Sequence, residues 1–281
     1  MLVYLNGEFM PLEEARISPL DRGFTFGDGV YEVIPVYNHR IFRLQEHLQR
    51  LDNSLRQIYM ENPMSMQEWE NILERIVGEN DGDDQSIYLQ VTRGVSPRDH
   101  AFDDKLKPTI FIMSKPLLQP DNTAGAKAIV REDIRWHLCH IKAITLLPSV
   151  LLRHEARLAG AKEAILVSSG EVTEGAASNV FVCSQGRILT PPKSERLLPG
   201  ITRDLIIELL QEADLPCEER TFDDDTLRQA DEIWITSSTQ EIVPIIRLDD
   251  RPVGHGKPGP VWHQAIRIYQ QFKADYCAGR V

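Results

Sequence analysis

Residues 139–152 read CHIKAITLLPSVLL, an apolar stretch in which Lys142 is the only residue among Lys, Arg, Asp and Glu. An ammonium group is expensive to bury unless it becomes neutral or gains partners. A desolvated lysine has a lowered pKa and can attack a carbonyl carbon as a free amine. The stretch equally fits a lysine at a strand end whose charged head reaches water. Other motifs in the chain must decide between these two interpretations.

A helix start downstream offers a place for an anion. Residues 197–213 read LLPGITRDLIIELLQEA, in which Pro199-Gly200 precede an amphipathic helix. The amide groups of Ile201, Thr202 and Arg203 should then point out of the helix N-terminus, where phosphate binds readily. The same pattern is also a common N-cap, with Thr202 closing the first turn.

Two further groups of side chains suit an oxyanion. A buried strand at 232–238 ends in a hydroxyl cluster, which suits phosphate oxygens or simple turn formation. The cluster consists of Ser237, Ser238 and Thr239. A helix expected from Leu44 carries a basic ridge along one flank, which is either a solvated face or the edge of an anion pocket. The ridge consists of Arg43, His47 and Arg50.

Two polar motifs have both a functional and a structural interpretation. Glu174, in EVTEGAASNVFV (171–182), lies between a turn and a buried strand, where a carboxylate can hold a protonated ring nitrogen or act as a turn residue. In RGVSPRDHAF (93–102), Arg98 and His100 are two apart, so an extended segment would aim both at one face as a carboxylate receptor. This segment also fits a polar surface loop.

Turn signals and apolar periodicity predict a mixed α+β and α/β fold in two domains. Hairpins are expected through Asn6-Gly7 and Asn38-His39, and further strands at 86–94, 108–115, 126–132, 164–169, 179–183 and 232–238. Helices are expected from Leu44 and over 66–80, 149–161, 202–213 and 260–277. We expect a small N-terminal α+β domain over 1–118, a linker over 119–125 rich in Pro, Asn and Gly, and a C-terminal domain over 126–281 that carries Lys142.

Composition narrows the possible partners. Lys and Arg total 31 against 42 Asp and Glu, and this net charge of −11 disfavours nucleic acid and acidic membranes as partners. The four cysteines form no CxxC pair, which predicts no metal site and suits a reducing, cytoplasmic compartment. The first ten residues resemble no secretory signal, and no apolar run reaches the length of a membrane span.

In combination, the motifs resemble the fold type IV pyridoxal-phosphate enzymes, which include branched-chain and D-amino-acid aminotransferases and aminodeoxychorismate lyases. The resemblance covers nearly the whole chain and follows the family's order. It is carried by FGDGVYEV (26–33), the helix with Arg50, the Ile141-Lys142 pair, the block at 173–181, PGITRD (199–204) and TSST (236–239). The C-terminal domain is then expected to be a mixed, β-barrel-like sheet with helices.

The resemblance implies a role for each candidate residue. Lys142 would be the catalytic Schiff-base lysine for pyridoxal 5′-phosphate, and Glu174 would pair with the pyridine nitrogen. Leu198 would press on the cofactor ring. The phosphate would be held by Arg50, the amides of Ile201 and Thr202, and Ser237 and Ser238. The substrate would be bound by Tyr31, Arg98, His100 and Thr239, with Arg98 and His100 reaching in from a second subunit, which implies a homodimer.

The implied activity is a ping-pong exchange of an amino group between a D-amino acid, such as D-alanine or D-glutamate, and a 2-oxo acid. Alternatives within the same class are a branched-chain L-aminotransferase, an (R)-amine aminotransferase and aminodeoxychorismate lyase. One departure is visible, because Ala176-Ala177 stand where the D-specific enzymes carry serines. Hydroxyl contacts near the cofactor are then expected to be fewer.

Overall fold

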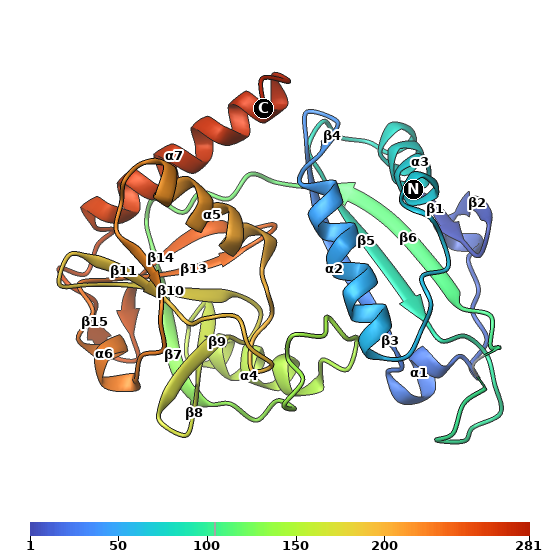
Figure 1. The fold of residues 1–281 in the computed structure, drawn as a ribbon, viewed down its shortest axis with the longest axis horizontal. Helices are drawn as coiled ribbons and strands as arrows, with labels where there is room; N and C mark the ends of the chain where they lie inside the picture. The colour runs from blue at the N-terminus through green and yellow to red at the C-terminus, as the bar shows by residue number, and fades with distance from the viewer. Residues whose placement is uncertain (104) are drawn as a thin grey trace. The chain divides into compact units, whose positions relative to one another are not determined.

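A computed structural model describes residues 1–103 and 105–281. They fall into two compact units. Unit 1 comprises residues 1–118 and 141–146, and unit 2 comprises residues 119–140 and 147–281. Figure 1 shows that both units combine sheets with helices, which confirms the predicted mixed fold.

Unit 1 is built on a six-stranded sheet with the order β2-β1-β6-β5-β3-β4, in which every neighbouring pair is antiparallel. The strands are β1 (Leu2–Leu5), β2 (Glu8–Pro11), β3 (Gly29–Tyr37), β4 (Arg40–Ile41), β5 (Gln85–Thr92) and β6 (Thr109–Pro116). Both predicted hairpins are confirmed, and Asn38 and His39 have positive φ angles of 49° and 61°. Such angles are those of a two-residue turn that matches strand twist.

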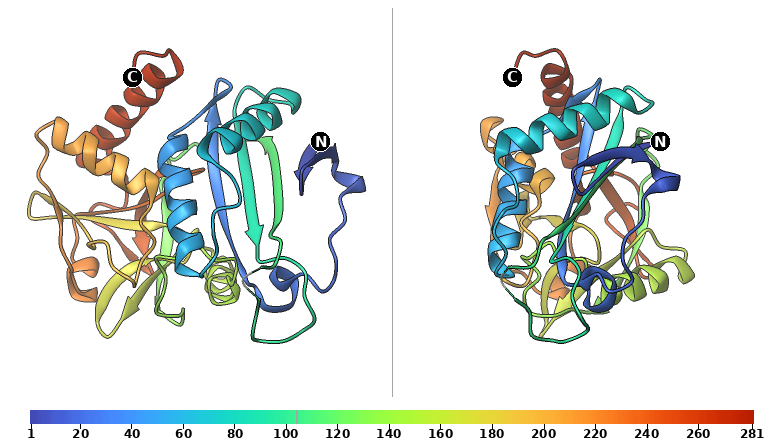
Figure 2. Two further views of the ribbon diagram at one scale, coloured as in Figure 1. Left: turned by 45° about the vertical axis from the view of Figure 1, so that its right-hand side comes forward. Right: turned by 90° about the vertical axis from the view of Figure 1, so that its right-hand side faces the viewer.

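Two helices, α2 (Leu44–Gln57) and α3 (Met66–Glu79), cover one face of this sheet (Figure 2). The apolar stripe of α2, including Leu48, Leu51 and Leu55, is fully buried. A capping box between Ser65 and Glu68 fixes the start of α3. Short helices η1 (Leu12–Glu14) and α1 (Arg22–Phe26) complete the unit.

Alternation along β3 divides its side chains between two faces of the sheet. Glu32 and Ile34 belong to the buried side on which α2 packs, whereas Tyr31 alternates to the opposite side beside Tyr88 of β5. A single strand therefore supplies candidate residues to two different environments.

Unit 2 contains a nine-stranded sheet with the order β12-β11-β10-β13-β14-β7-β8-β9, and β15 pairs with β14. The strands are β7 (Ala126–Glu132), β8 (Glu163–Ser168), β9 (Glu171–Gly175), β10 (Asn179–Ser184), β11 (Arg187–Thr190), β12 (Cys217–Glu219), β13 (Glu232–Ser237), β14 (Glu241–Leu248) and β15 (Arg251–Pro252). Strand β7 runs parallel to both neighbours, while most other pairs are antiparallel, so the sheet is mixed as predicted. Figure 1 shows that its strands curve round one another instead of lying flat.

Four helices accompany this sheet: α4 (Leu147–Leu158), α5 (Ile201–Glu212), α6 (Asp224–Arg228) and α7 (Pro260–Cys277). The limits of α7 agree with the predicted range. Strands β9, β11, β12, β14 and β15 were not predicted, because each is short or interrupted by proline or by charged residues. No helix among residues 1–103 and 105–281 has the length and apolar character needed to span a membrane.

The segment that carries Lys142, residues 141–146, packs with unit 1 although we predicted it within the C-terminal domain. Strand β4 pairs only with the far end of β3, which leaves the edge at Gly29–Tyr31 available. The segment pairs with that edge, because Tyr31 N donates to Lys142 O and Ile144 N donates to Gly29 O, both at 3.0 Å. The domain limits themselves stay a prediction.

Gly94 offers a test of how tightly unit 1 is packed. A methyl group added there would lie 2.0 Å from the carbonyl oxygen of Lys107, at a φ of +97°. Gly7 has a similar φ of +105° with open space around it. We predict that Gly7→Ala lowers the unfolding free energy by about 1–2 kcal/mol through backbone strain. Gly94→Ala should lower it by about 2 kcal/mol more through the collision. Urea denaturation compares the two, and equal losses would contradict the packing argument.

Candidate active site

Lys142 is half-buried beside Tyr31. Its backbone N–H donates to Ser54 Oγ of α2 at 3.2 Å, and its Nζ lies 4.2 Å from the centre of the Tyr31 ring. The lysine is therefore held by backbone bonds on two sides while its amine rests against an aromatic face. Two candidate site residues, Lys142 and Tyr31, therefore lie together within one unit.

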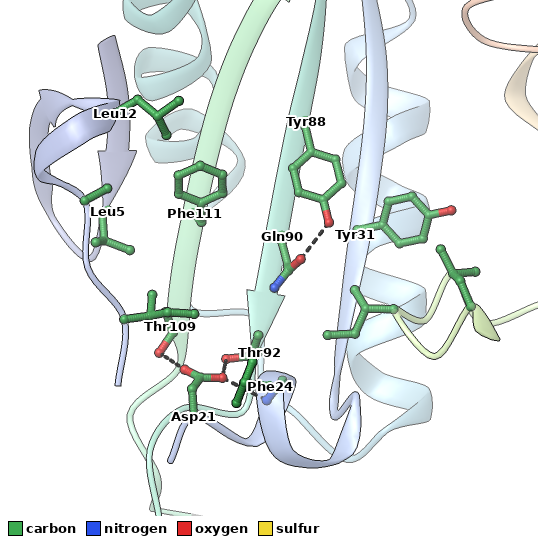
Figure 3. A pocket seen from close by; sticks show the side chains of 15 residues that line it. Leu5, Leu12, Asp21, Phe24, Tyr31, Tyr88, Gln90, Thr92, Thr109 and Phe111 are labelled. Carbon is green, nitrogen blue, oxygen red and sulfur yellow. Dashed lines mark hydrogen bonds between the residues drawn. The ribbon is translucent and has the colours of Figure 1, made fainter. Parts of the chain in front are cut away.

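Tyr31 also lies on the wall of a cavity of about 550 Å³ on the sheet face away from α2. Figure 3 shows Tyr88 and Gln90 on the adjacent strand, joined by a 2.6 Å hydrogen bond from the Tyr88 hydroxyl. Burial raises the pKa of Tyr88 to about 12, so its hydroxyl stays protonated. At the foot of the cavity, the Asp21 carboxylate accepts hydrogen bonds from Thr92 and Thr109 at 2.8 and 2.6 Å (Figure 3).

Arg50 belongs to a buried ionic network and not to a solvated ridge. It donates from Nε and Nη2 to the two oxygens of Glu32, at 2.8 and 2.7 Å, and His47 Nδ1 lies 2.7 Å from the same carboxylate. Burial alone would raise the pKa of Glu32, but the Arg50 guanidinium and the bond from His47 lower it to about 2. Burial also lowers the pKa of His47, which keeps it neutral near pH 7. Arg43 lies outside this network and pairs with Glu46.

Arg98 and His100 lie together on an exposed loop, both against the ring of Phe26. The buried Arg22 fixes this loop by donating to the carbonyl oxygens of Asp99 and His100, at 2.6 and 3.2 Å. Arg98 and His100 thus contact the same ring, and their role as a carboxylate receptor stays a prediction. In the described part of the chain, neither residue lines the cavity beside Tyr31.

In unit 2, Glu174 is the centre of a second buried network. Only 4% of its surface is exposed, and it accepts hydrogen bonds from Arg135 Nη1, from Asn179 Nδ2 at 3.0 Å and from Leu198 N at 3.1 Å. Arg135 is shared with Asp133, whose carboxylate lies 2.8 Å from Arg135 Nη2. Burial raises the pKa of Glu174 to about 7, against the lowering effect of Arg135. Its ionisation is therefore sensitive to any charge placed beside it.

The start of α5 is joined to this network through Asn179. Asn179 Nδ2 donates to Leu198 O at 2.9 Å, and a methyl group on Gly200 would lie 2.0 Å from Asn179 Oδ1. Gly200 is the N-cap of α5, and no side chain caps the helix, so the first turn with Ile201 and Thr202 begins without a side-chain acceptor. At the end of β13, the predicted cluster of Ser237, Ser238 and Thr239 is half-buried.

Comparison with known proteins decides the family. Residues 29–248 match the model of the amino-transferase class IV family. The chain belongs to the class IV aminotransferases. These enzymes use pyridoxal 5′-phosphate, so the enzyme class and the cofactor predicted from the sequence are confirmed.

Relatives with similar sequences match this class IV aminotransferase over nearly its full length. It is 41% identical over 263 residues to the D-alanine aminotransferase of Bacillus licheniformis, covering 93% of each chain. It is 38% identical over 273 residues to that of Staphylococcus haemolyticus, covering 96% of this chain and 97% of the relative.

Solved branched-chain aminotransferases share the fold. That of Thermoproteus uzoniensis with norvaline has a TM-score of 0.90 and 27% identity, covering 100% of this chain and 95% of the other. That of Escherichia coli has a TM-score of 0.88 and 28% identity, with the same coverage. The predicted fold type is therefore confirmed.

The described residues fit the cofactor of this family. The uncapped first turn of α5 suits a phosphate, and the buried Glu174 carboxylate suits a protonated ring nitrogen. Lys142 offers a half-buried amine, and Arg50 offers a cation whose orientation is fixed by Glu32.

Sequence reasoning missed the residues that support the candidate site. Arg135 and Asp133 flank a single residue after β7, and this alternation of opposite charges beside a strand was the available signal. Asn179 was noted only as part of the block at 173–181. Glu32 lies in FGDGVYEV, where a carboxylate inside an apolar strand indicates a buried partner.

The Glu174 network predicts a shifted pH profile. Arg135→Gln removes the guanidinium that lowers the pKa of Glu174, so this pKa should rise from its value of about 7. If transamination needs the ionised carboxylate, the acidic limb of its pH–rate profile should move to higher pH. Arg135→Lys, which keeps the charge, should restore most of the profile.

Arg131→Gln is the matched control, because Arg131 is 37% exposed and pairs with Glu155 at 2.7 Å. Surface pairs of this kind contribute little. An Arg135→Gln profile identical to that of Arg131→Gln would remove Arg135 from the functional network.

Proposed function

We propose that this enzyme transfers amino groups between D-amino acids and 2-oxo acids. The observation that carries the proposal is the 36–41% identity, over nearly the full chain, to proteins described as D-alanine aminotransferases. The two branched-chain structural relatives are 27% and 28% identical. The presence of Tyr31 together with Arg98 and His100 supports the same choice.

Several of the proposed cofactor contacts come from the two buried networks, that of Arg50 with Glu32 and that of Glu174. Lys142 would bind pyridoxal 5′-phosphate as a Schiff base, and Glu174 would hold the proton on the ring nitrogen. Leu198, fixed through its backbone N–H to Glu174, would contact the ring face. The phosphate would be bound by Arg50, the amides of Ile201 and Thr202, and the hydroxyls of Ser237 and Ser238.

When bound, the cofactor supplies an electron sink for the pair of electrons left on the substrate Cα. The chain's own residues would do the rest. Lys142 Nζ would accept the proton from the substrate Cα as a general base. Glu32 would keep the Arg50 guanidinium charged and fixed, so that binding the phosphate requires no rearrangement of that side chain.

Handedness would follow from where the substrate α-carboxylate is anchored. Lys142 can act on one face only, so Cα–H must point at that face, and the side of the carboxylate anchor then selects the enantiomer. We assign the anchor to Tyr31, Arg98 and His100. Thr239 would contact the remainder of the substrate.

From the position of this anchor we further propose that the enzyme is a homodimer. Arg98 and His100 are exposed and do not line the cavity beside Tyr31 of their own chain, which supports their action on the site of a second copy. Arg22 would serve as a positioning residue, because it holds the loop backbone. The four scattered cysteines are free thiols, which suits a reducing compartment and supports a cytoplasmic location.

The function is tested with a panel of D- and L-amino acids as donors, with pyruvate or 2-oxoglutarate as acceptor. We expect D-alanine and D-glutamate to react faster than their L-enantiomers. Faster turnover of L-leucine or L-valine than of any D-amino acid would assign the enzyme to the branched-chain group instead.

For the anchor, we predict that Arg98→Ala raises KM for D-alanine by roughly ten- to a hundredfold, because a charge-assisted contact is lost. Amines without a carboxylate should be affected much less. Arg56→Ala is the control, since this arginine is 62% exposed and pairs with Asp52. An unchanged KM in Arg98→Ala would leave RGVSPRDHAF as a surface loop.

For the lysine, borohydride reduction of the holoenzyme should fix the cofactor to Lys142, as read by peptide mapping. Lys142→Ala should retain the cofactor without a covalent bond and lose nearly all turnover. An adduct on another lysine would overturn the assignment of Lys142.

A further inference from the structure

A second cavity, of about 340 Å³, lies within unit 2 and has a polar, charged lining. Three sides are built by α4, the start of β8 and the end of β13. Ile235, Ser237 and Thr239 all line it, which follows from the alternation of side chains along an extended segment. The cavity therefore includes two hydroxyls of the candidate active site.

The fourth side is the turn that follows Glu174. Gly175 N donates to Ser178 O, which closes the turn and brings Ser178 to the cavity. A methyl group on Gly175 would lie 2.2 Å from Ser178 Oγ and 3.1 Å from Glu163 Cγ, so only glycine fits. The wall of the cavity and the buried Glu174 are thus parts of one local structure.

Glu163 is the only acid that the described residues place on this lining, and its oxygens are occupied. Oε1 accepts from Ala164 N at 2.9 Å and lies 3.2 Å from Arg153 Nη1, while Oε2 accepts from Ser178 Oγ at 2.9 Å. The side chain is 2% exposed. Glu163 therefore serves to hold Arg153 and Ser178 in place, and its charge is already paired.

Lys162 is a half-buried cation on the same lining. Burial lowers its pKa, and the nearby Arg153 lowers it further. Among the ion pairs of residues 1–103 and 105–281, none involves Lys162. A carboxylate entering the cavity would offset the cost of burying the Lys162 ammonium and would lie beside the hydroxyls of Ser237 and Thr239. The charge of Arg153 is already balanced by Glu163.

We propose that this cavity binds the distal carboxylate of dicarboxylic substrates, such as D-glutamate, D-aspartate and their 2-oxo acids, with Lys162 as the specificity-determining residue. The proposal rests on the proposed function, because Ser237 and Thr239 belong to both sites. Its volume is at the lower end of ligand cavities, which suits a short side chain. Ala177 on the lining adds no hydroxyl, and the Ser178 hydroxyl already donates to Glu163, so Ser237 and Thr239 supply the hydroxyl donors.

The test compares two half-reactions of the holoenzyme, followed by the change in cofactor absorbance. In Lys162→Met, kcat/KM for D-glutamate should fall about tenfold or more, while that for D-alanine should change by less than about twofold. Lys162→Arg should retain the D-glutamate rate. Lys257→Met is the control, because Lys257 is an exposed lysine of the same unit, and it should leave both rates unchanged.

A binding measurement separates this proposal from the proposed function. Glutarate should raise the melting temperature of the parent protein more than butyrate does, and Lys162→Met should abolish the difference. Arg153→Met is a poor variant, since it would leave the buried Glu163 without its cation. Equal losses for D-glutamate and D-alanine, or glutarate protection that survives in Lys162→Met, would overturn the assignment of Lys162. Absence of both half-reactions in the parent would instead refute the D-amino-acid activity.

Discussion

The carboxylate of Glu174 brings together segments of unit 2 that are separate in sequence. It accepts N–H groups from Arg135 after β7, from Asn179 at the start of β10 and from Leu198 before α5. A charge this deeply buried is tolerated only with such partners, and removing one of them from a buried pair typically costs about 3–5 kcal/mol. The residue proposed to act on the cofactor ring thus also orders the start of α5, proposed to bind the phosphate. Mutations in this network affect folding and chemistry together.

In unit 1, the buried charge is instead a guanidinium, that of Arg50. The charge of the Arg50 guanidinium is balanced by the Glu32 carboxylate, and the bidentate geometry fixes the orientation of Arg50. The pKa of Glu32 lies near 2 in the fold against 4.5 for the free group, so the ionised form stabilises the protein above pH 4.5. That contribution is lost as the pH falls toward 2. The ionised form of Glu174 makes the opposite contribution to stability. Its raised pKa makes ionisation between pH 4.5 and 7 unfavourable unless further positive charge lies nearby.

The features that sequence predicted are those set by local rules or by motifs in order. Asn6-Gly7 and Asn38-His39 specify their hairpins by turn chemistry, and the apolar stripe of α2 specifies its buried face. The family and its cofactor followed from several motifs in one order. The partners of the candidate residues did not follow, because the pairing of Glu32 with Arg50 or of Glu174 with Arg135 joins residues on different elements. The packing of Lys142 against β3 was missed for the same reason, since an available strand edge is a property of the assembled sheet.

Selection of the substrate's handedness and of its side chain falls on separate parts of the chain under the proposed assignments. The α-carboxylate anchor uses Tyr31 on β3 and the loop of Arg98 and His100, whereas the charged cavity uses Lys162, which immediately precedes β8. In the described residues, no hydrogen bond joins the two sets. Substitutions in one set are therefore expected to act independently of substitutions in the other. The hydroxyls of Ser237 and Thr239 are the exception, since they belong to both the candidate site and the cavity lining. Because hydroxyls can both donate and accept hydrogen bonds, they tolerate uncharged side chains of the substrate as well as anionic ones. The preference for a second carboxylate then depends on the charge of Lys162.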